Sequence, residues 1–175
     1  MILNKQVGVF LNFVHNRFKQ YIGAFFQGEG YNITPEQFLV MDTLWGKGSL
    51  SQQQIADTIL KDKNSVVKLI DGLEKKNLIK RVANSADRRQ NLIELTPHAR
   101  EIQEHVTDIA MNAVDLIIKD IPKNELHVFI KVLAKMAENM NDDVNLLQLA
   151  QVKAPNGIIG DNSAANGKTT NIHPL

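Results

Sequence analysis

The chain has 175 residues and a formal net charge of +1, with 43% hydrophobic and 22% charged residues. This balance is typical of one soluble globular domain, with or without a tail, and argues against disorder along the whole length. The lack of cysteine excludes disulfides and thiol-based redox sensing, and the lack of an apolar run of about 20 residues or a signal peptide predicts a cytoplasmic protein with no membrane partner.

The N-terminal residues 1–33 are expected to contain one long helix. Between residues 7 and 26, an apolar side chain recurs every three or four positions, at Phe10, Val14, Phe18, Tyr21 and Phe25. This spacing places the five side chains on one helix face, which needs a partner surface. Gly28, Gly30 and Asn32 are expected to end the helix.

Two capping boxes and one acidic cap predict the next three helices. Thr34 with Gln37 begins a helix that runs to about Trp45, and Ser51 with Gln54 begins a short helix that reaches Ile59. Asp62 is placed to cap a fourth helix that closes at Asn77 and buries a stripe of Val66, Leu69, Ile70 and Leu73. Two short helices with a tight link predict a helix-turn-helix.

The periodicity then changes from helical to extended. Residues 78–82 and 91–95 are short β-prone runs, and the segment 83–90 between them contains the turn formers Asn84, Ser85 and Asp87. We therefore expect a hairpin with a charged tip, which would form the wing of a winged helix-turn-helix spanning residues 34–96.

Two further helices are expected in residues 97–145. Thr96 and Pro97 open a helix of about twenty residues, and a last helix carries an apolar stripe between Leu126 and Met140. The first and last helices are candidates for a dimer interface. Residues 146–175 are rich in Asn, Gly, Ser and Thr and are expected to be a tail. The predicted fold is mostly α, with a small β-hairpin wing.

Positive charge is concentrated in residues 61–100, which hold 10 Lys and Arg against 5 Asp and Glu, whereas the other residues hold 10 against 14. Such a segment is typical of a surface that neutralises phosphates, although a solvated basic face has the same composition. The N-terminal turn of a helix in the major groove aims short polar side chains at base edges, which makes Asn64, Ser65 and Lys68 candidates. The alternative is that Asn64 and Ser65 form only local hydrogen bonds.

The tip of the hairpin carries a second candidate contact. Arg88 and Arg89 are placed to reach the narrow minor groove, with Asp87 orienting one guanidinium. Taken alone, an Asp-Arg-Arg tip is also compatible with a solvated turn.

The wing Asp87–Thr96 and the helix stretch Asn64–Ile79 resemble the MarR/SlyA family of winged-helix regulators. The wing of that family reads Asp-x-Arg, a β-strand and then Leu-Thr, and the likeness covers roughly residues 7–140. The family usually has glycine at the positions of Asn77 and Ala99. The resemblance implies that Arg89 is the minor-groove arginine, that Lys63 lies near the same surface, and that the DNA backbone is contacted by Ser51, Gln52 and Gln53.

The resemblance further implies a homodimer whose first and last helices interlock and whose two winged domains meet a pseudo-palindromic operator in double-stranded DNA, with half-sites about 10 bp apart. It also implies a small aromatic or anionic ligand in a cleft lined by the first, second and fifth helices. The candidate lining residues are His15, Arg17, Tyr21, Phe25 and Trp45. Each of them is equally compatible with simple packing.

Catalytic and metal-binding motifs are not visible in the sequence. The spacing of His15, His98, His105, His127 and His173 matches no zinc motif, and no phosphate loop or nucleophile elbow is present. We therefore predict no enzyme activity, no metal and no cofactor. The leading prediction is a dimeric repressor released by a small molecule, and the alternative is a winged-helix module that binds a protein.

Overall fold

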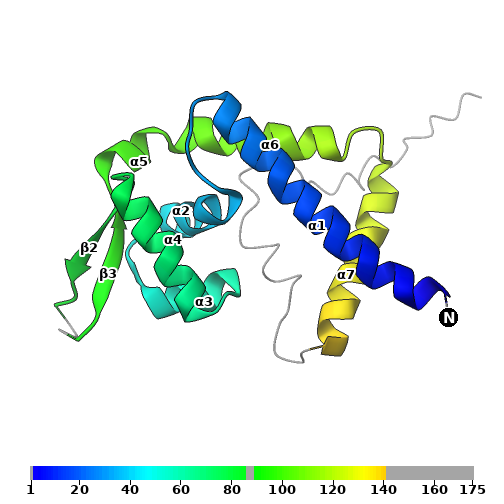
Figure 1. Ribbon diagram of the computed structural model, residues 1–175, viewed down its shortest axis with the longest axis horizontal. Coiled ribbons are helices and arrows are strands. Elements are labelled where there is room, and N and C mark those ends of the chain that lie inside the picture. Colours follow the sequence, from blue (N-terminus) through cyan, green and yellow to red (C-terminus); the bar gives the residue numbers. More distant parts are fainter. Residues whose placement is uncertain (1, 86–88, 141–175) are drawn as a thin grey trace, which may run out of the picture. The chain divides into compact units, whose positions relative to one another are not determined.

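The computed structural model describes residues 2–85 and 89–140, with side chains from residue 5 onward (Figure 1). The elements in chain order are α1 (Ile2–Gly28), α2 (Pro35–Lys47), β1 (Leu50–Ser51), α3 (Gln52–Ile59), α4 (Lys63–Lys75), β2 (Ile79–Ala83), β3 (Asn91–Leu95), α5 (Pro97–Glu101), α6 (Gln103–Ile117) and α7 (Lys123–Met140). The described residues fall into two compact units that divide after residue 119, and α7 belongs to the second. The predicted mostly helical fold with a small wing is confirmed. None of the described helices has the length and apolarity needed to cross a bilayer.

Side-chain caps determine where the helices of the first unit begin. The Thr34 hydroxyl accepts a hydrogen bond from the Gln37 N–H at 3.2 Å, and Gln37 Oε1 accepts one from the Thr34 N–H at 3.2 Å. Ser51 and Gln54 form the same reciprocal pair at the start of α3. Both predicted capping boxes are confirmed, and each cap satisfies backbone N–H groups that a helix terminus leaves without a partner.

The helices α2, α3 and α4 enclose the apolar core of the helix-turn-helix region. Val66, Ile70 and Leu73 of α4 are fully buried, together with Val40 and Met41 of α2 and Ile55 of α3. In Figure 1, α3 and α4 lie next to each other, and the hairpin of β2 and β3 lies beside α4. Burial of a Val or Ile side chain contributes about 2 kcal/mol, so packing rather than helix propensity holds α4 in place.

Two close approaches to Gln37 of α2 hold the C-terminal part of α4 in place. A side chain at Gly72 would place its Cβ 2.6 Å from Gln37 Nε2, so glycine allows α2 to approach closely. Lys76 Nζ donates to Gln37 Oε1 at 2.7 Å, and burial lowers the pKa of Lys76. Asn77 closes the helix at φ 56°, as predicted, because asparagine tolerates the left-handed conformation.

A three-stranded antiparallel sheet with the order β1-β3-β2 forms the wing and its base. Ile79 pairs with Leu95 and Ala83 with Asn91, so β2 begins one residue later than predicted. The additional strand β1 pairs Leu50 with Ile93. It was not predicted because two residues are too few to show an alternating pattern.

The prediction of a single helix after Thr96 is wrong, because residues 97–117 form the two helices α5 and α6. The break is at Ile102, whose ψ is 0°, between α5 and α6. Ile102 still packs against the core, so the apolar spacing continues through the break. Periodicity therefore could not reveal it.

The long helix α1 lies across α6 within the first unit (Figure 1). It ends at Gly28, one of the residues predicted to end it, and it begins before the apolar stripe that starts at Phe10. Tyr31 Oη and His105 Nδ1 form a hydrogen bond of 2.9 Å between the segment after α1 and α6. Lys19 of α1 pairs with Glu36 of α2. Burial raises the pKa of Glu36, but the hydrogen bond and charge of Lys19 outweigh this and leave it lowered.

Candidate nucleic-acid interface

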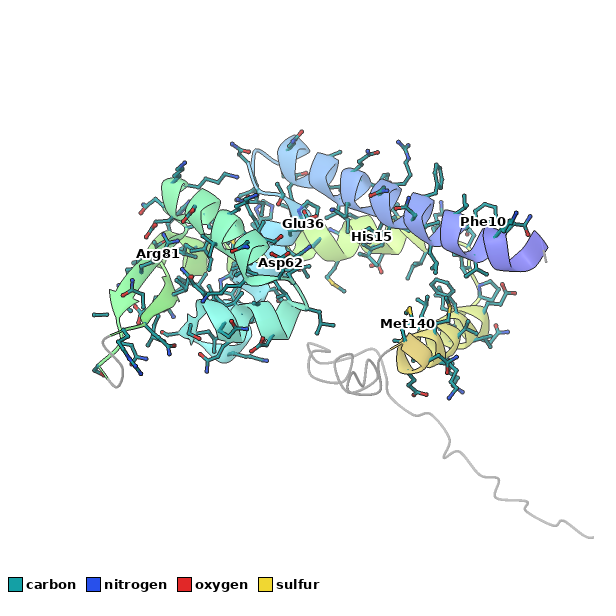
Figure 2. The ribbon with its side chains drawn as sticks, turned by 60° about the horizontal axis from the view of Figure 1, so that its bottom comes forward. Phe10, His15, Glu36, Asp62, Arg81 and Met140 are labelled. Carbon is teal, nitrogen blue, oxygen red and sulfur yellow. The ribbon has the colours of Figure 1, made fainter. Side chains whose placement is uncertain are left out.

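The N-terminal turn of α4 is organised by Asp62. One carboxylate oxygen accepts the Ser65 N–H at 2.9 Å, and the other accepts the Ser65 hydroxyl at 2.6 Å. These two hydrogen bonds, the hydroxyl first, hold the pKa of Asp62 below its usual value. The predicted cap is confirmed, and Figure 2 shows Asp62 at the start of the helix. Ser65, a candidate for base contact, is half-buried and its hydroxyl is engaged in the cap.

The other candidates on α4 lie on its solvent side. Lys63, Asn64 and Lys68 are exposed, and helical spacing puts Asn64 and Lys68 on the face opposite the buried Val66 and Ile70. Lys63, in the first turn, lies beside the buried stripe. A helix of this kind presents polar and cationic side chains to the groove while its apolar face stays in the core. The first and second turns of α4 therefore remain accessible to a ligand.

The start of α3 contributes a second set of polar groups. Ser51 is 8% exposed and its hydroxyl accepts the Gln54 N–H, so this side chain is part of the cap. Gln52 is half-buried, and the exposed Gln53 donates from Nε2 to Asp57 Oδ1 at 2.8 Å. The capped terminus also directs backbone N–H groups outward, which favours anions.

A hollow of about 430 Å³, hereafter the polar hollow, connects these groups to the wing. It is lined by Ser51, Gln52 and Gln53 at the start of α3, by Lys63 of α4, and by Arg89, Gln90 and Asn91 where the wing turn enters β3. Five predicted DNA-contact residues thus converge from three separate segments. Gln90 and Asn91 were missed, because polar residues in a hairpin turn carry no local signal that separates a lining role from simple solvation.

The wing is braced against α4 by ion pairs. The Arg81 guanidinium on β2 pairs with the carboxylates of Asp71 and Glu74 on α4, and Figure 2 shows Arg81 on the wing side of the molecule. On the other side of the sheet, Glu94 accepts from Ser49 Oγ at 3.0 Å and lies 3.4 Å from Lys80 Nζ. These contacts fix the direction in which the hairpin leaves the core.

The tip of the wing is only partly described. Arg89 is exposed, whereas Asp87 and Arg88, predicted to act with it in the minor groove, lie outside the described residues. The polar hollow therefore includes one of the two predicted wing arginines.

A second hollow of about 430 Å³, hereafter the apolar hollow, lies on α1. Its lining residues are Phe13, Val14, Arg17, Phe18, Gln20, Tyr21, Ala24 and Ile117. Arg17 donates to Gln20 Oε1 at 3.2 Å, and Tyr21 stacks at 5.0 Å from the Phe25 ring. Of the five candidate ligand residues, Arg17 and Tyr21 line this hollow.

The other three candidates have different surroundings. His15 is exposed on α1 (Figure 2) and is not among the lining residues of the apolar hollow. Trp45 is half-buried, donates from Nε1 to the Ala99 carbonyl at 3.0 Å, and packs against the core together with Phe25. Among the described residues, no three His, Asp or Glu side chains are grouped as metal ligands.

The sequence is similar to those of known regulators. The MarR family model matches residues 33–90, which include α2, α3, α4 and β2 and end just before β3. The HTH-type transcriptional regulator MhqR of Bacillus subtilis is 31% identical over 98 residues, which cover 49% of this chain and 68% of MhqR.

The fold is similar to solved structures at lower identity. A MarR mutant from E. coli in complex with operator DNA gives a TM-score of 0.69 at 18% identity, covering 75% of this chain and 93% of that one. BpsR of Bordetella bronchiseptica gives 0.68 at 23% identity, covering 75% and 93%. These likenesses support the same winged-helix fold. On the family match and the identity to MhqR, the chain belongs to the MarR family of winged helix-turn-helix transcriptional regulators.

Proposed function

We propose that this chain is a cytoplasmic repressor that binds a pseudo-palindromic operator as a homodimer. The observation that carries the proposal is the polar hollow, where the capped start of α3, Lys63 and Arg89 face one volume. Two cationic side chains and outward N–H groups favour phosphate oxygens, and the exposed Asn64 and Lys68 extend the same surface along α4. The solved MarR complex contains operator DNA, which is the ligand this surface suits.

A salt titration tests the proposal. The protein is bound to DNA from upstream of its own coding sequence, with random duplex of equal length as competitor. Phosphate contacts release counterions, so affinity should fall steeply with salt and the promoter should bind more tightly. An absence of DNA binding even at low salt would contradict the proposal and favour the protein-binding module.

The contribution of the wing is tested with two arginine variants. Arg89→Ala removes a cation from the polar hollow, and it should weaken binding and reduce the salt slope by about one. Arg100→Ala is the matched control, because Arg100 is exposed on α5 and does not line that hollow. Equal effects of the two substitutions would argue against a role for the wing.

The dimer is supported by apolar side chains on α1 that face solvent. Val9, Phe10 and Phe13 are 68%, 60% and 61% exposed, and α7, taken by itself, exposes Val128 and Phe129 at 61% and 52%. Large apolar side chains grouped on a helix indicate a protein interface. Phe10→Glu should convert a dimeric mass in light scattering to a monomeric one, whereas Asn16→Glu, at an exposed polar position of the same helix, should leave it dimeric.

The ligand response is supported by the apolar hollow. Its lining combines aromatic rings with the single cation of Arg17, which suits a small aromatic anion. BpsR is a relative in fold whose DNA binding is regulated by 6-hydroxynicotinic acid. With benzoate and 6-hydroxynicotinate as probes, calorimetry should detect binding that Arg17→Gln weakens and Arg100→Gln does not. If neither probe binds, small aromatic anions are not ligands of this repressor.

A further inference from the structure

The helix α4 carries one half-buried apolar side chain, Val67, outside the stripe that packs in the core. Val66, Ile70 and Leu73 are fully buried, and Leu69 is half-buried against the core. Val67 is half-buried, but it is not among the described apolar residues that pack against that core. A β-branched residue is also a weaker helix former than alanine or leucine, so neither core packing nor helix propensity accounts for valine here.

The position of Val67 is defined by helical spacing. It follows Asn64 by three residues and Lys63 by four, so these side chains are neighbours on the helix surface. One turn later, Asp71 pairs with Arg81 of β2, which marks the side of α4 nearest the wing. Val67 therefore lies between the exposed polar positions of the first turn and the wing side of the helix.

The chemistry of the major groove gives an apolar side chain one specific partner. Among the base edges, only thymine presents a methyl group, and small apolar side chains contact it. Asparagine pairs bidentately with adenine at N6 and N7. The Ser65 hydroxyl is held by Asp62, and Lys63 lines the polar hollow. The side chains that remain for reading bases on the first two turns are Asn64, Val67 and Lys68.

We propose that Val67 is a specificity-determining residue that contacts the 5-methyl group of a thymine in each operator half-site. Asn64, one turn earlier, reads an adjacent A·T pair, so the half-site contains neighbouring A·T pairs at the position of the α4 N-terminus. This inference rests on the proposed DNA-binding function, and it assigns that function a base preference.

The experiment removes the thymine methyl group from the DNA and, separately, truncates the Val67 side chain of the protein. A consensus duplex is first selected by the full-length protein from random duplexes, and each thymine is then replaced by uracil in turn. Wild-type protein should bind the uracil duplex about fourfold more weakly at the contacted position, the loss expected for one methyl-sized apolar contact.

The variant Val67→Ala should bind thymine and uracil duplexes equally, with the affinity of wild-type protein for uracil. Alanine is a strong helix former, so the fold is retained, and thermal unfolding followed by circular dichroism checks this. The matched control is Leu39→Ala, because Leu39 is an apolar residue of α2 that is 45% exposed. This control should keep the full thymine preference.

Two results would overturn the inference while leaving DNA binding intact. In one, Val67→Ala keeps the fourfold thymine preference, so another residue contacts the methyl group. In the other, wild-type protein binds all uracil duplexes as well as the thymine duplex. Failure to select any consensus is a different result, because it contradicts the proposed function itself.

Discussion

The polar hollow and the apolar hollow have the same volume, about 430 Å³, and opposite linings. Seven polar residues line the one between α3, α4 and the wing, whereas the one on α1 is lined mainly by aromatic and aliphatic side chains with one arginine. Size therefore does not separate their roles. The lining chemistry suits a phosphate backbone in the first case and a small aromatic anion in the second.

Charge reversal in the two hollows gives the largest expected difference. Lys63→Glu should reduce DNA affinity on the order of a hundredfold and lower the salt slope by about one, because a phosphate contact becomes a repulsion. Glutamate is favourable in the first turn of a helix, so the loss would not reflect unfolding of α4. Fluorescence anisotropy with a labelled promoter duplex measures both quantities.

The control for that experiment lies in the apolar hollow. Arg17→Glu reverses a charge on α1, outside the polar hollow, and should leave the DNA affinity and its salt slope within about twofold of wild type. A comparable loss in both variants would mean that net charge, rather than the local site, sets the affinity.

The two hollows also differ in how far the sequence predicts them. Local chemistry defines the polar hollow: Ser51 and Asp62 cap helices, and the turn before Asn91 brings Arg89 back toward Lys63. Caps and turns are determined by a few neighbouring residues, so the sequence predicts where these helices and the hairpin begin. The DNA-contact roles of Ser51, Gln52, Gln53 and Lys63 were implied by the family resemblance, and that of Arg89 by both the resemblance and the charged wing tip. The engagement of Ser65 with Asp62 had been left open as an alternative.

The apolar hollow depends on contacts that are distant in sequence. Phe13 and Ile117 meet only because α1 crosses α6, and the stripe of one helix does not reveal its partner. Arg17 and Tyr21 line the hollow, whereas for Trp45 the alternative of simple packing holds: it packs against the core and donates to the Ala99 carbonyl, 54 positions away. The family resemblance named the helices around the cleft and not the side chains.

The cap at Ser51 gives the next effect, because it lies in the wall of the polar hollow. Ser51→Ala removes the acceptor of the Gln54 N–H and should lower the free energy of unfolding by about 1 kcal/mol in urea titrations. Ser51→Thr keeps a hydroxyl at the same position and should restore most of this loss. If the alanine variant were as stable as wild type, the cap would contribute nothing to the hollow.

Acid should weaken the cap at Asp62, which directly precedes Lys63 of the polar hollow. Its pKa is lowered by the Ser65 hydroxyl and N–H, so the folded chain binds this proton less readily than the unfolded chain. The contribution is present above the unfolded pKa of about 3.8 and is lost as the pH falls through the folded value. Asp62→Asn keeps a cap acceptor without titrating.

Urea titrations from about pH 5 to about pH 2.5 measure this contribution. Asp62→Asn should lose less stability over that range than wild type, whereas Asp108→Asn, at an exposed position of α6, should follow wild type. Parallel losses in all three proteins would show that the Asp62 cap does not contribute to the acid sensitivity.

The smallest expected effect concerns the turn that joins α3 to α4 beside the polar hollow. Leu60 has a φ of 53°, in the left-handed region that costs a residue with a Cβ roughly 1–2 kcal/mol, and its side chain is 56% exposed. Leu60→Gly removes that strain and little packing, but glycine also gains freedom in the unfolded chain, which offsets part of the benefit. The net expectation is a rise of about 0.5 kcal/mol in the free energy of unfolding. Leu60→Ala retains the Cβ and should give no such rise. Equal stabilities of the glycine and alanine variants would show that the turn is unstrained and that leucine is tolerated there without cost.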